Sequence, residues 1–238
     1  MSVPERRGLF ITGTGTGVGK TFVTRGLAHA LRHDGVSVAA IKPYETGCAP
    51  DPEDALALGR ACGRPELANA EGLYRARRPV APWAATLAGE PPPAPIDTLA
   101  ATVRGLAASS EIALVEGAGG LRVPVDADQD VADLAIALGL PLLLVARDEL
   151  GVLSHTLCAY EAARARGLHV VGVVLSSSLE AGDPSQAHNT RILQDRLEAP
   201  VFHLGPTDDE NSAIARALEA SGALCLLRDT WDLPKSTE

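Results

Sequence analysis

A glycine-rich segment near the N-terminus constrains the fold of this chain more than any other feature. Residues 13–21 read Gly-Thr-Gly-Thr-Gly-Val-Gly-Lys-Thr, after an apolar stretch at 8–12 and before a helix-like stretch that begins at Lys20. A strand, a glycine-rich turn, Gly-Lys-Thr and a helix, in this order, predict a phosphate-binding loop. Glycines let backbone N–H groups turn toward one anion, and the helix N-terminus adds positive potential there.

The segment also predicts two individual roles. Lys20 is expected to reach the terminal phosphates of a nucleotide, and the Thr21 hydroxyl to bind Mg²⁺. The spacing is unusual, because the common pattern has glycine where this chain has Thr14, and the leading glycine is Gly13. The alternative is a strand-to-helix turn without a ligand, but a lysine at that helix start has little structural purpose.

Length and composition limit the class of protein. The 238 residues fit one α/β domain over 1–238, and the low aromatic content, 3%, predicts an aliphatic core. A net charge of −9 disfavours a broad nucleic-acid or anionic-membrane surface. The cysteines are scattered without metal-ligand spacing, which favours a reducing cytoplasm over a zinc site or a disulfide framework. No segment resembles a signal peptide or a membrane span, and the tail at 229–238 is expected to be loosely held.

Apolar runs alternate with amphipathic runs along the whole chain. The expected strands cover 8–12, 36–41, 112–115, 142–146, 170–175 and 201–204. The expected helices cover 20–33, 54–62, 96–108, 132–138, 154–166, 187–197 and 212–220. This alternation predicts a doubly wound, mainly parallel sheet with helices on both faces. The proline-rich segment 79–95 is expected to be a surface connection.

Polar residues follow three of the expected strands, where the ligands of such a sheet gather. Lys42 precedes Pro43 after the second strand and is a candidate second cation for phosphates, although a lysine at a strand end often only snorkels to solvent. Glu116 follows the strand at 112–115 and is a candidate Mg²⁺ carboxylate. The segment Gly117-Ala118-Gly119-Gly120 is expected to be a turn that lets an anionic substrate approach the backbone.

Asp54 begins an expected helix, and two interpretations stay open for it. It is either an ordinary first-turn acid or a second Mg²⁺ carboxylate. No signature of a hydrolase serine or of a Cys-His nucleophile is present.

Taken together, these residues resemble the dethiobiotin synthetase family. The likeness rests on the segment 13–21 with its unusual spacing, on Lys42-Pro43 with Thr46-Gly47, on 54–57 and on 115–120. It extends from about Leu9 to about Leu218. The resemblance implies a P-loop NTPase-like fold, a homodimer, and ATP, Mg²⁺, carbon dioxide and 7,8-diaminononanoate as the bound molecules.

The resemblance also implies roles for individual residues. Lys20, Lys42 and Thr16 would be catalytic, with Thr21, Asp54 and Glu116 as metal ligands. Thr46, Gly119 and Gly120 would contact the substrate. Nucleotide contacts would come from Gly17, Val18, Gly19, Lys20, Thr21, Phe22, Asp54, Glu116, Gly117, Ala118, Gly119, Ser176, Ser177, Gly205, Pro206 and Thr207.

The implied reaction needs no protein nucleophile. The diamine captures carbon dioxide as a carbamate, the carbamate is phosphorylated by ATP, and the second amine closes the ring and expels phosphate. Such a phosphoryl transfer depends on positioning and charge neutralisation.

The chain departs from the family pattern at several positions. Gly15 and Gly17 stand where some members carry acids, and Asn189 lies near a position where some have a tyrosine that reaches the partner's substrate. Ser176 replaces an asparagine that reads adenine, and serine lacks the paired donor and acceptor of an amide. Weak discrimination between nucleotide bases is therefore expected.

Two other functions compete with this interpretation. A glutamine-dependent cobyrinate-type amide synthetase has a similar ATP domain but normally an added glutaminase domain. A nucleotide-switch protein of the partitioning class carries a second lysine early in the loop, where this chain has Gly15.

Overall fold

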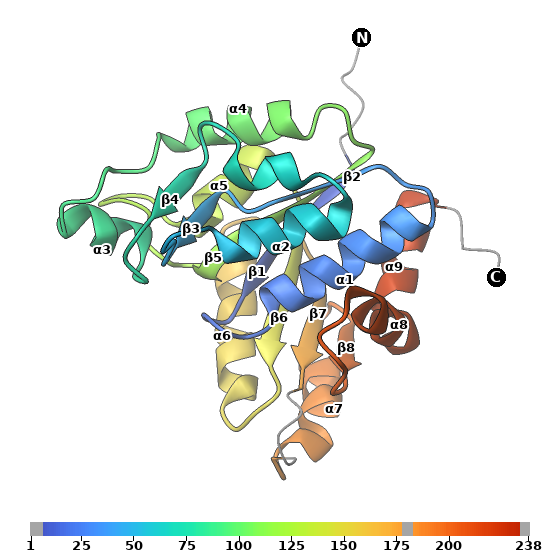
Figure 1. Ribbon diagram of the computed structural model, residues 1–238. Helices are drawn as coiled ribbons and strands as arrows, with labels where there is room; N and C mark the ends of the chain where they lie inside the picture. The colour runs from blue at the N-terminus through green and yellow to red at the C-terminus, as the bar shows by residue number, and fades with distance from the viewer. Residues whose placement is uncertain (1–6, 178–182, 234–238) are drawn as a thin grey trace.

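A parallel sheet forms the centre of the chain in the computed structural model, which describes residues 7–177 and 183–233 (Figure 1). Its strands lie in the order β2-β5-β1-β6-β7-β8, and every neighbouring pair is parallel. They are β1 (Gly8–Gly13), β2 (Val38–Ile41), β5 (Ile112–Gly120), β6 (Leu142–Arg147), β7 (Val170–Ser176) and β8 (Val201–Leu204). The doubly wound α/β fold predicted from the sequence is confirmed.

Helices cover both faces of this sheet. The helices of the described residues are α1 (Lys20–His33), α2 (Glu53–Cys62), α3 (Pro82–Leu87), α4 (Ile96–Leu106), α5 (Val131–Leu138), α6 (Val152–Ala165), α7 (Gln186–Arg196), α8 (Asn211–Ser221) and α9 (Ala223–Trp231). Helix α1 packs between α2 and α8 on the face toward the viewer in Figure 1. On the other face α4 packs on α5, and α6 packs on α7. None of the described helices is long and apolar enough to cross a membrane.

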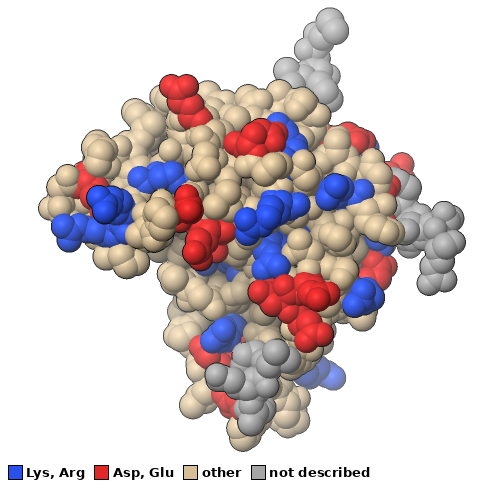
Figure 2. Space-filling view, viewed as in Figure 1, with Lys and Arg blue, Asp and Glu red and all other residues tan. Residues whose placement is uncertain are grey.

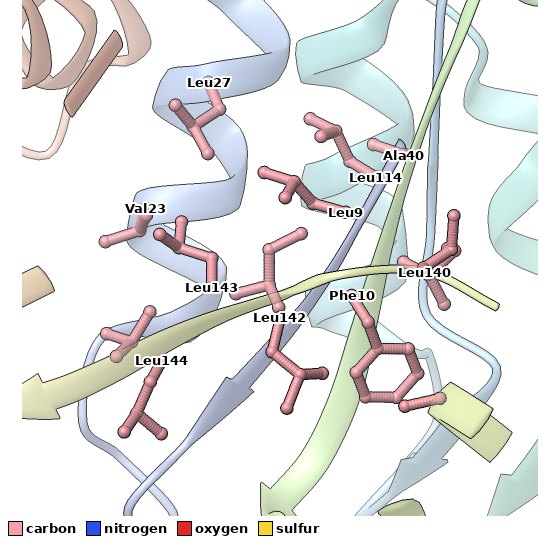
Figure 3. Close-up of a cluster of buried hydrophobic side chains, with 14 of the residues drawn as sticks. Leu9, Phe10, Val23, Leu27, Ala40, Leu114, Leu140, Leu142, Leu143 and Leu144 are labelled. Atoms are coloured by element: carbon pink, nitrogen blue, oxygen red, sulfur yellow. The ribbon is translucent and has the colours of Figure 1, made fainter. Parts of the chain in front are cut away.

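The core is aliphatic, as the composition predicts. Leu9 and Phe10 of β1 and Leu142 and Leu144 of β6 are almost fully buried. Figure 3 shows Leu9 and Leu143 on the side of the sheet that faces Val23 and Leu27 of α1, whereas the Phe10 ring points away from α1. On the face of the molecule seen in Figure 2, acidic and basic side chains are interspersed.

Several elements were not predicted. The short strands β3 (Tyr44–Thr46) and β4 (Tyr74–Ala76) form a separate parallel pair, and a 3-10 helix spans Pro65–Asn69. The proline-rich segment 79–95 is not only a surface connection, because α3 lies within it with Pro82 and Ala85 buried. Proline is well tolerated in the first turn of a helix, which explains why this segment can begin one.

Two further expectations need correction. The strand predicted at 112–115 continues to Gly120, so Glu116 and the glycines after it belong to β5 and do not form a turn. The segment 229–238 was expected to be loosely held, but its first three residues belong to α9. The side chains of Leu224, Leu227 and Trp231 in this helix are buried. Burial of these apolar side chains holds the helix to the core, and residues 234–238 lie outside the described part of the chain.

Candidate active site

The phosphate-binding loop joins β1 to α1 at the carboxyl edge of the sheet. Gly17 and Gly19 have φ angles of 74° and 97°, in the left-handed region that glycine adopts without strain. Gly19 is the N-cap of α1, and no side chain caps this helix end. The first N–H groups of α1 therefore point toward the site, as an anion would require.

Lys20 folds over this loop. Its ammonium donates to the Gly15 carbonyl at 2.7 Å, and only 5% of the residue is exposed. Burial lowers the pKa of Lys20 from its ordinary 10.5 to about 8; the Lys42 ammonium adds to the lowering and the Glu116 carboxylate opposes it. An arriving phosphate would favour the charged form of this lysine and so raise its pKa again.

Lys42 lies at the centre of the site, immediately after β2. Its Nζ donates to Oε1 of Glu116 at 2.8 Å and also to the Asp54 carboxylate. Burial alone would lower the pKa of Lys42, but Glu116 and Asp54 together raise it above the ordinary value. Lys42 is thus a fixed positive charge and does not merely snorkel to solvent.

The carboxylate groups around Lys42 fit a magnesium site. Thr21 donates its hydroxyl to the same Oε1 of Glu116 at 2.8 Å, so Thr21, Asp54 and Glu116 meet around one ammonium group. Oε2 of Glu116 is buried and has no hydrogen-bond partner among the described residues. Oxygen ligands supplemented by phosphates and water are what Mg²⁺ prefers. Within 7–177 and 183–233, no group of three or more His, Cys, Asp or Glu side chains could hold a metal ion, so Mg²⁺ here would depend on two carboxylates, the Thr21 hydroxyl, phosphates and water.

A cavity of about 420 Å³ opens beside these groups. It is lined by Thr16, Gly17, Gly19, Lys20, Thr21, Phe22, Lys42, Tyr44, Glu45, Thr46, Asp54, Ala118 and Gly119. Most of the site residues expected from the sequence thus meet in one place, although they come from distant segments. Val18 and Gly120 do not line the cavity, and Glu116 lies buried beside it.

The glycines of β5 differ in their purpose. A Cβ atom on Gly117 would lie 2.9 Å from Val131 and 3.0 Å from Phe10, so this glycine is required by core packing. Gly119 has a φ of 63°, and its Cβ position is 3.3 Å from the Thr16 hydroxyl. Gly119 therefore brings the end of β5 against the phosphate-binding loop, whereas Gly117 is not open to an anion.

The residues expected to bind the base lie outside this cavity. Ser176 is buried behind the loop, with its Oγ only 2.9 Å from the Cβ position of Gly19. Ser177 shares a 3.0 Å hydrogen bond with Nε2 of His203. Gly205, Pro206 and Thr207 line a second hollow of about 450 Å³ together with His203.

Two further side chains are held by hydrogen bonds within the protein. Asn189 is buried, and its amide donates to Oδ1 of Asp148 at 2.7 Å, so it turns into the protein. Glu45, which the sequence did not single out, accepts hydrogen bonds from the backbone N–H groups of Asp54 and Ala55 at 2.9 Å each. An acid beside Thr46 and shortly before Asp54 is the only sequence signal that could have drawn attention to it.

A glycine-rich loop at the head of α1, beside a parallel sheet of order β2-β5-β1-β6-β7-β8, defines a P-loop nucleotide-binding fold. The family model described as "AAA domain" matches residues 7–208. Among solved structures, the septum site-determining protein MinD of Pyrococcus horikoshii, complexed with Mg-ADP, aligns with a TM-score of 0.53 and 19% identity over 95% of this chain and 96% of that chain. The signal recognition particle receptor FtsY of Elizabethkingia anophelis aligns with a TM-score of 0.54 and 14% identity, covering 93% of this chain and 66% of that chain. These likenesses show the fold alone.

Comparison with curated proteins is more specific. A protein of an Anaeromyxobacter species named ATP-dependent dethiobiotin synthetase BioD is 46% identical over 77% of this chain and 82% of its own length. Proteins with the same name from Anaeromyxobacter dehalogenans and Caulobacter vibrioides are 41% and 44% identical, over 89% and 76% of this chain and 95% and 84% of their own lengths. The chain belongs to the dethiobiotin synthetase family, which comprises ATP-dependent ligases of biotin biosynthesis.

Proposed function

We propose that this chain catalyses the ATP- and Mg²⁺-dependent closure of 7,8-diaminononanoate with carbon dioxide, giving dethiobiotin, ADP and phosphate. The observation that carries the proposal is the placement of Lys42 between Asp54 and Glu116, beside a cavity that also holds Lys20 and Thr21. This arrangement concentrates positive charge and metal ligands where phosphoryl transfer needs them.

The reaction proceeds in three balanced steps. One amine of the diamine attacks carbon dioxide, forming a C–N bond and releasing a proton, to give a carbamate. A carbamate oxygen then attacks the γ-phosphorus of ATP, and the bond to ADP breaks. The second amine attacks the carbonyl carbon and loses a proton, so that the ring closes, the C–O bond to the phosphoryl group breaks and phosphate leaves with the original carbamate oxygen.

The residues of this chain supply charge and position for these steps. Lys20 and the N–H groups of the loop hold the phosphates, and Thr16 contacts them from the exposed side of the loop. Lys42 stabilises the charge on the carbamate and on the transferring phosphoryl group. Mg²⁺, held by Thr21, Asp54 and Glu116, would neutralise charge on the β- and γ-phosphates.

The substrate is proposed to contact Thr46 and Gly119, which line the cavity, and Gly120, which follows Gly119 in the chain. We further propose a homodimer, and a place in the cytoplasm, for which the scattered positions of the cysteines along the chain are the support. Ser176, Ser177 and the segment 205–207 are proposed to face the nucleotide base.

Product formation from isotopically labelled bicarbonate tests this function. The purified chain with diaminononanoate, ATP, Mg²⁺ and ¹⁴C-bicarbonate is expected to form labelled dethiobiotin and one ADP per product. Lys20→Met should abolish the label. Arg164→Ala, which removes an exposed cation of α6 that pairs with Glu198, should not. ATP hydrolysis without labelled dethiobiotin would reject the proposed function and favour the nucleotide-switch alternative.

A further inference from the structure

Helix α2, which carries Asp54, begins without a cap of its own. Its N-cap residue is Pro52, and no side chain at that position satisfies the first N–H groups of the helix. The cap comes instead from Glu45 on β3, whose Oε1 accepts from the N–H of Asp54 and whose Oε2 accepts from the N–H of Ala55, both at 2.9 Å. Both oxygens of one carboxylate are thus engaged by the first turn of α2.

This contact is built into the interior of the protein. Glu45 is only 6% exposed, and a negative charge there is favourably placed against the positive end of the helix. Strand β3, which carries Glu45, is fixed by its neighbour β4, in which Arg75 pairs in register with Glu45. The Arg75 guanidinium also donates to the Lys42 carbonyl at 3.0 Å. The segment that contains Lys42, Glu45 and Thr46 is therefore firmly joined to the start of α2.

We propose that Glu45 is a positioning residue that holds Asp54 in place for the metal and for Lys42. The Asp54 side chain is 46% exposed, so its own burial restrains it little. Without the Glu45 cap the first turn of α2 would be free to fray, and Asp54 would move with it. This inference rests on the proposed function only in taking Asp54 as a metal ligand.

Glu45 itself is not expected to bind the metal or the substrate. Each of its carboxylate oxygens already accepts a hydrogen bond from a backbone N–H group. Removal of the side chain would leave these two N–H groups without this acceptor. Its effect on catalysis should pass through Asp54.

The test compares Glu45→Ala, Glu45→Gln and a control, Glu111→Ala. Glu111 also accepts a hydrogen bond from a backbone N–H group, that of Ser37, at 2.9 Å. It directly precedes β5 and so lies at the amino ends of the strands, opposite the candidate site. The readouts are hydrogen exchange of the α2 amides, the affinity for Mn²⁺ in the presence of ADP by electron paramagnetic resonance, and kcat and KM.

Glu45→Ala is expected to speed exchange in the first turn of α2 and to weaken Mn²⁺ binding about tenfold or more, the scale for residues that orient a metal ligand. Glu45→Gln keeps one acceptor and should give an intermediate loss, and Glu111→Ala should leave all readouts at wild-type values. If Glu45→Ala fails to fold, Glu45→Gln carries the test alone.

Unchanged α2 exchange and Mn²⁺ affinity in Glu45→Gln and Glu45→Ala would overturn the proposal. An effect confined to the KM for diaminononanoate would also overturn it, by showing that Glu45 contacts the substrate. Exchange and Mn²⁺ binding do not depend on the reaction. A wild-type chain that makes no dethiobiotin but shows the expected exchange and Mn²⁺ changes would refute the proposed function and leave the role of Glu45 intact.

Discussion

The ammonium of Lys42 lies 2.8 Å from Oε1 of Glu116, and both residues are buried. The same carboxylate oxygen accepts the Thr21 hydroxyl, also at 2.8 Å. One carboxylate oxygen in β5 thus accepts hydrogen bonds from a lysine that follows β2 and from a threonine at the start of α1. Under the proposed function, the charge on Glu116 is therefore expected to affect both Mg²⁺ binding and the Lys42 ammonium.

Replacing Glu116 with glutamine tests this expectation. The amide oxygen can still accept a hydrogen bond and Asp54 still pairs with Lys42, so the free energy of unfolding should fall by about 1–3 kcal/mol, the scale for a buried group that loses a charge-assisted hydrogen bond. Loss of the metal carboxylate should lower kcat by about a hundredfold or more. Urea unfolding and steady-state kinetics measure the two effects, and unchanged activity at saturating ATP and Mg²⁺ would refute the assignment.

Lys42→Ala separates transition-state stabilisation from simple binding. A cation that neutralises charge developing during phosphoryl transfer contributes roughly two to three orders of magnitude to kcat. Diaminononanoate binding, measured by calorimetry, should weaken much less. If kcat is preserved and only substrate affinity falls, Lys42 binds ground state and transition state equally.

The lowered pKa of Lys20 predicts a pH-dependent nucleotide affinity. In the folded protein this lysine is mostly charged below about pH 8 and mostly neutral above that pH. A lysine with the ordinary pKa of 10.5 would stay charged throughout this range. Phosphates favour the charged form, so binding above pH 8 must take up a proton, and ADP affinity should fall by up to about tenfold per pH unit.

Calorimetry of ADP binding from about pH 7 to 9.5 checks this prediction. Lys20→Met should bind weakly and lose the slope above pH 8. An equal slope in wild type and Lys20→Met would assign the proton to another group.

Ser176 predicts weak selection among nucleotide bases. Its hydroxyl is buried against Gly19 and cannot offer the paired donor and acceptor of an amide. Loss of such a pair relaxes selectivity by about 1–3 kcal/mol, so GTP or CTP should support turnover within roughly two orders of magnitude of ATP in kcat/KM. Ser176→Asn introduces the missing amide and should increase the preference for ATP. A wild-type preference for ATP above about a thousandfold would show that other residues recognise the base.

Local sequence patterns predicted the frame of the molecule well. The bounds of α1 match the expected 20–33, because a glycine-rich turn and an amphipathic run mark a helix start without help from the rest of the chain. The parallel sheet followed from uninterrupted apolar runs such as β6. The phosphate-binding loop, Lys42 and Glu116 were likewise accessible, since parallel strands bring their carboxyl ends to one edge.

Features that depend on contacts between distant segments were not accessible. Strands β3 and β4 have three residues each and exist only as a pair. The cap on α2 joins Glu45 to Asp54 and Ala55 across a loop, where no helix-start pattern applies. Gly117 looked like part of an open turn, but its lack of a side chain is explained by contact with Phe10 and Val131 in the core.

Transfer of oxygen from carbon dioxide to phosphate tests the proposed chemistry most directly. The wild-type chain is mixed with diaminononanoate, Mg²⁺, ATP and bicarbonate labelled with ¹⁸O, in unlabelled water and for a time shorter than oxygen exchange with solvent. We expect dethiobiotin to form with one ¹⁸O atom in each released phosphate, because the carbamate oxygen that attacks the γ-phosphorus leaves with it. Dethiobiotin with unlabelled phosphate would contradict phosphorylation of a carbamate at this site, and the absence of dethiobiotin would contradict the function itself.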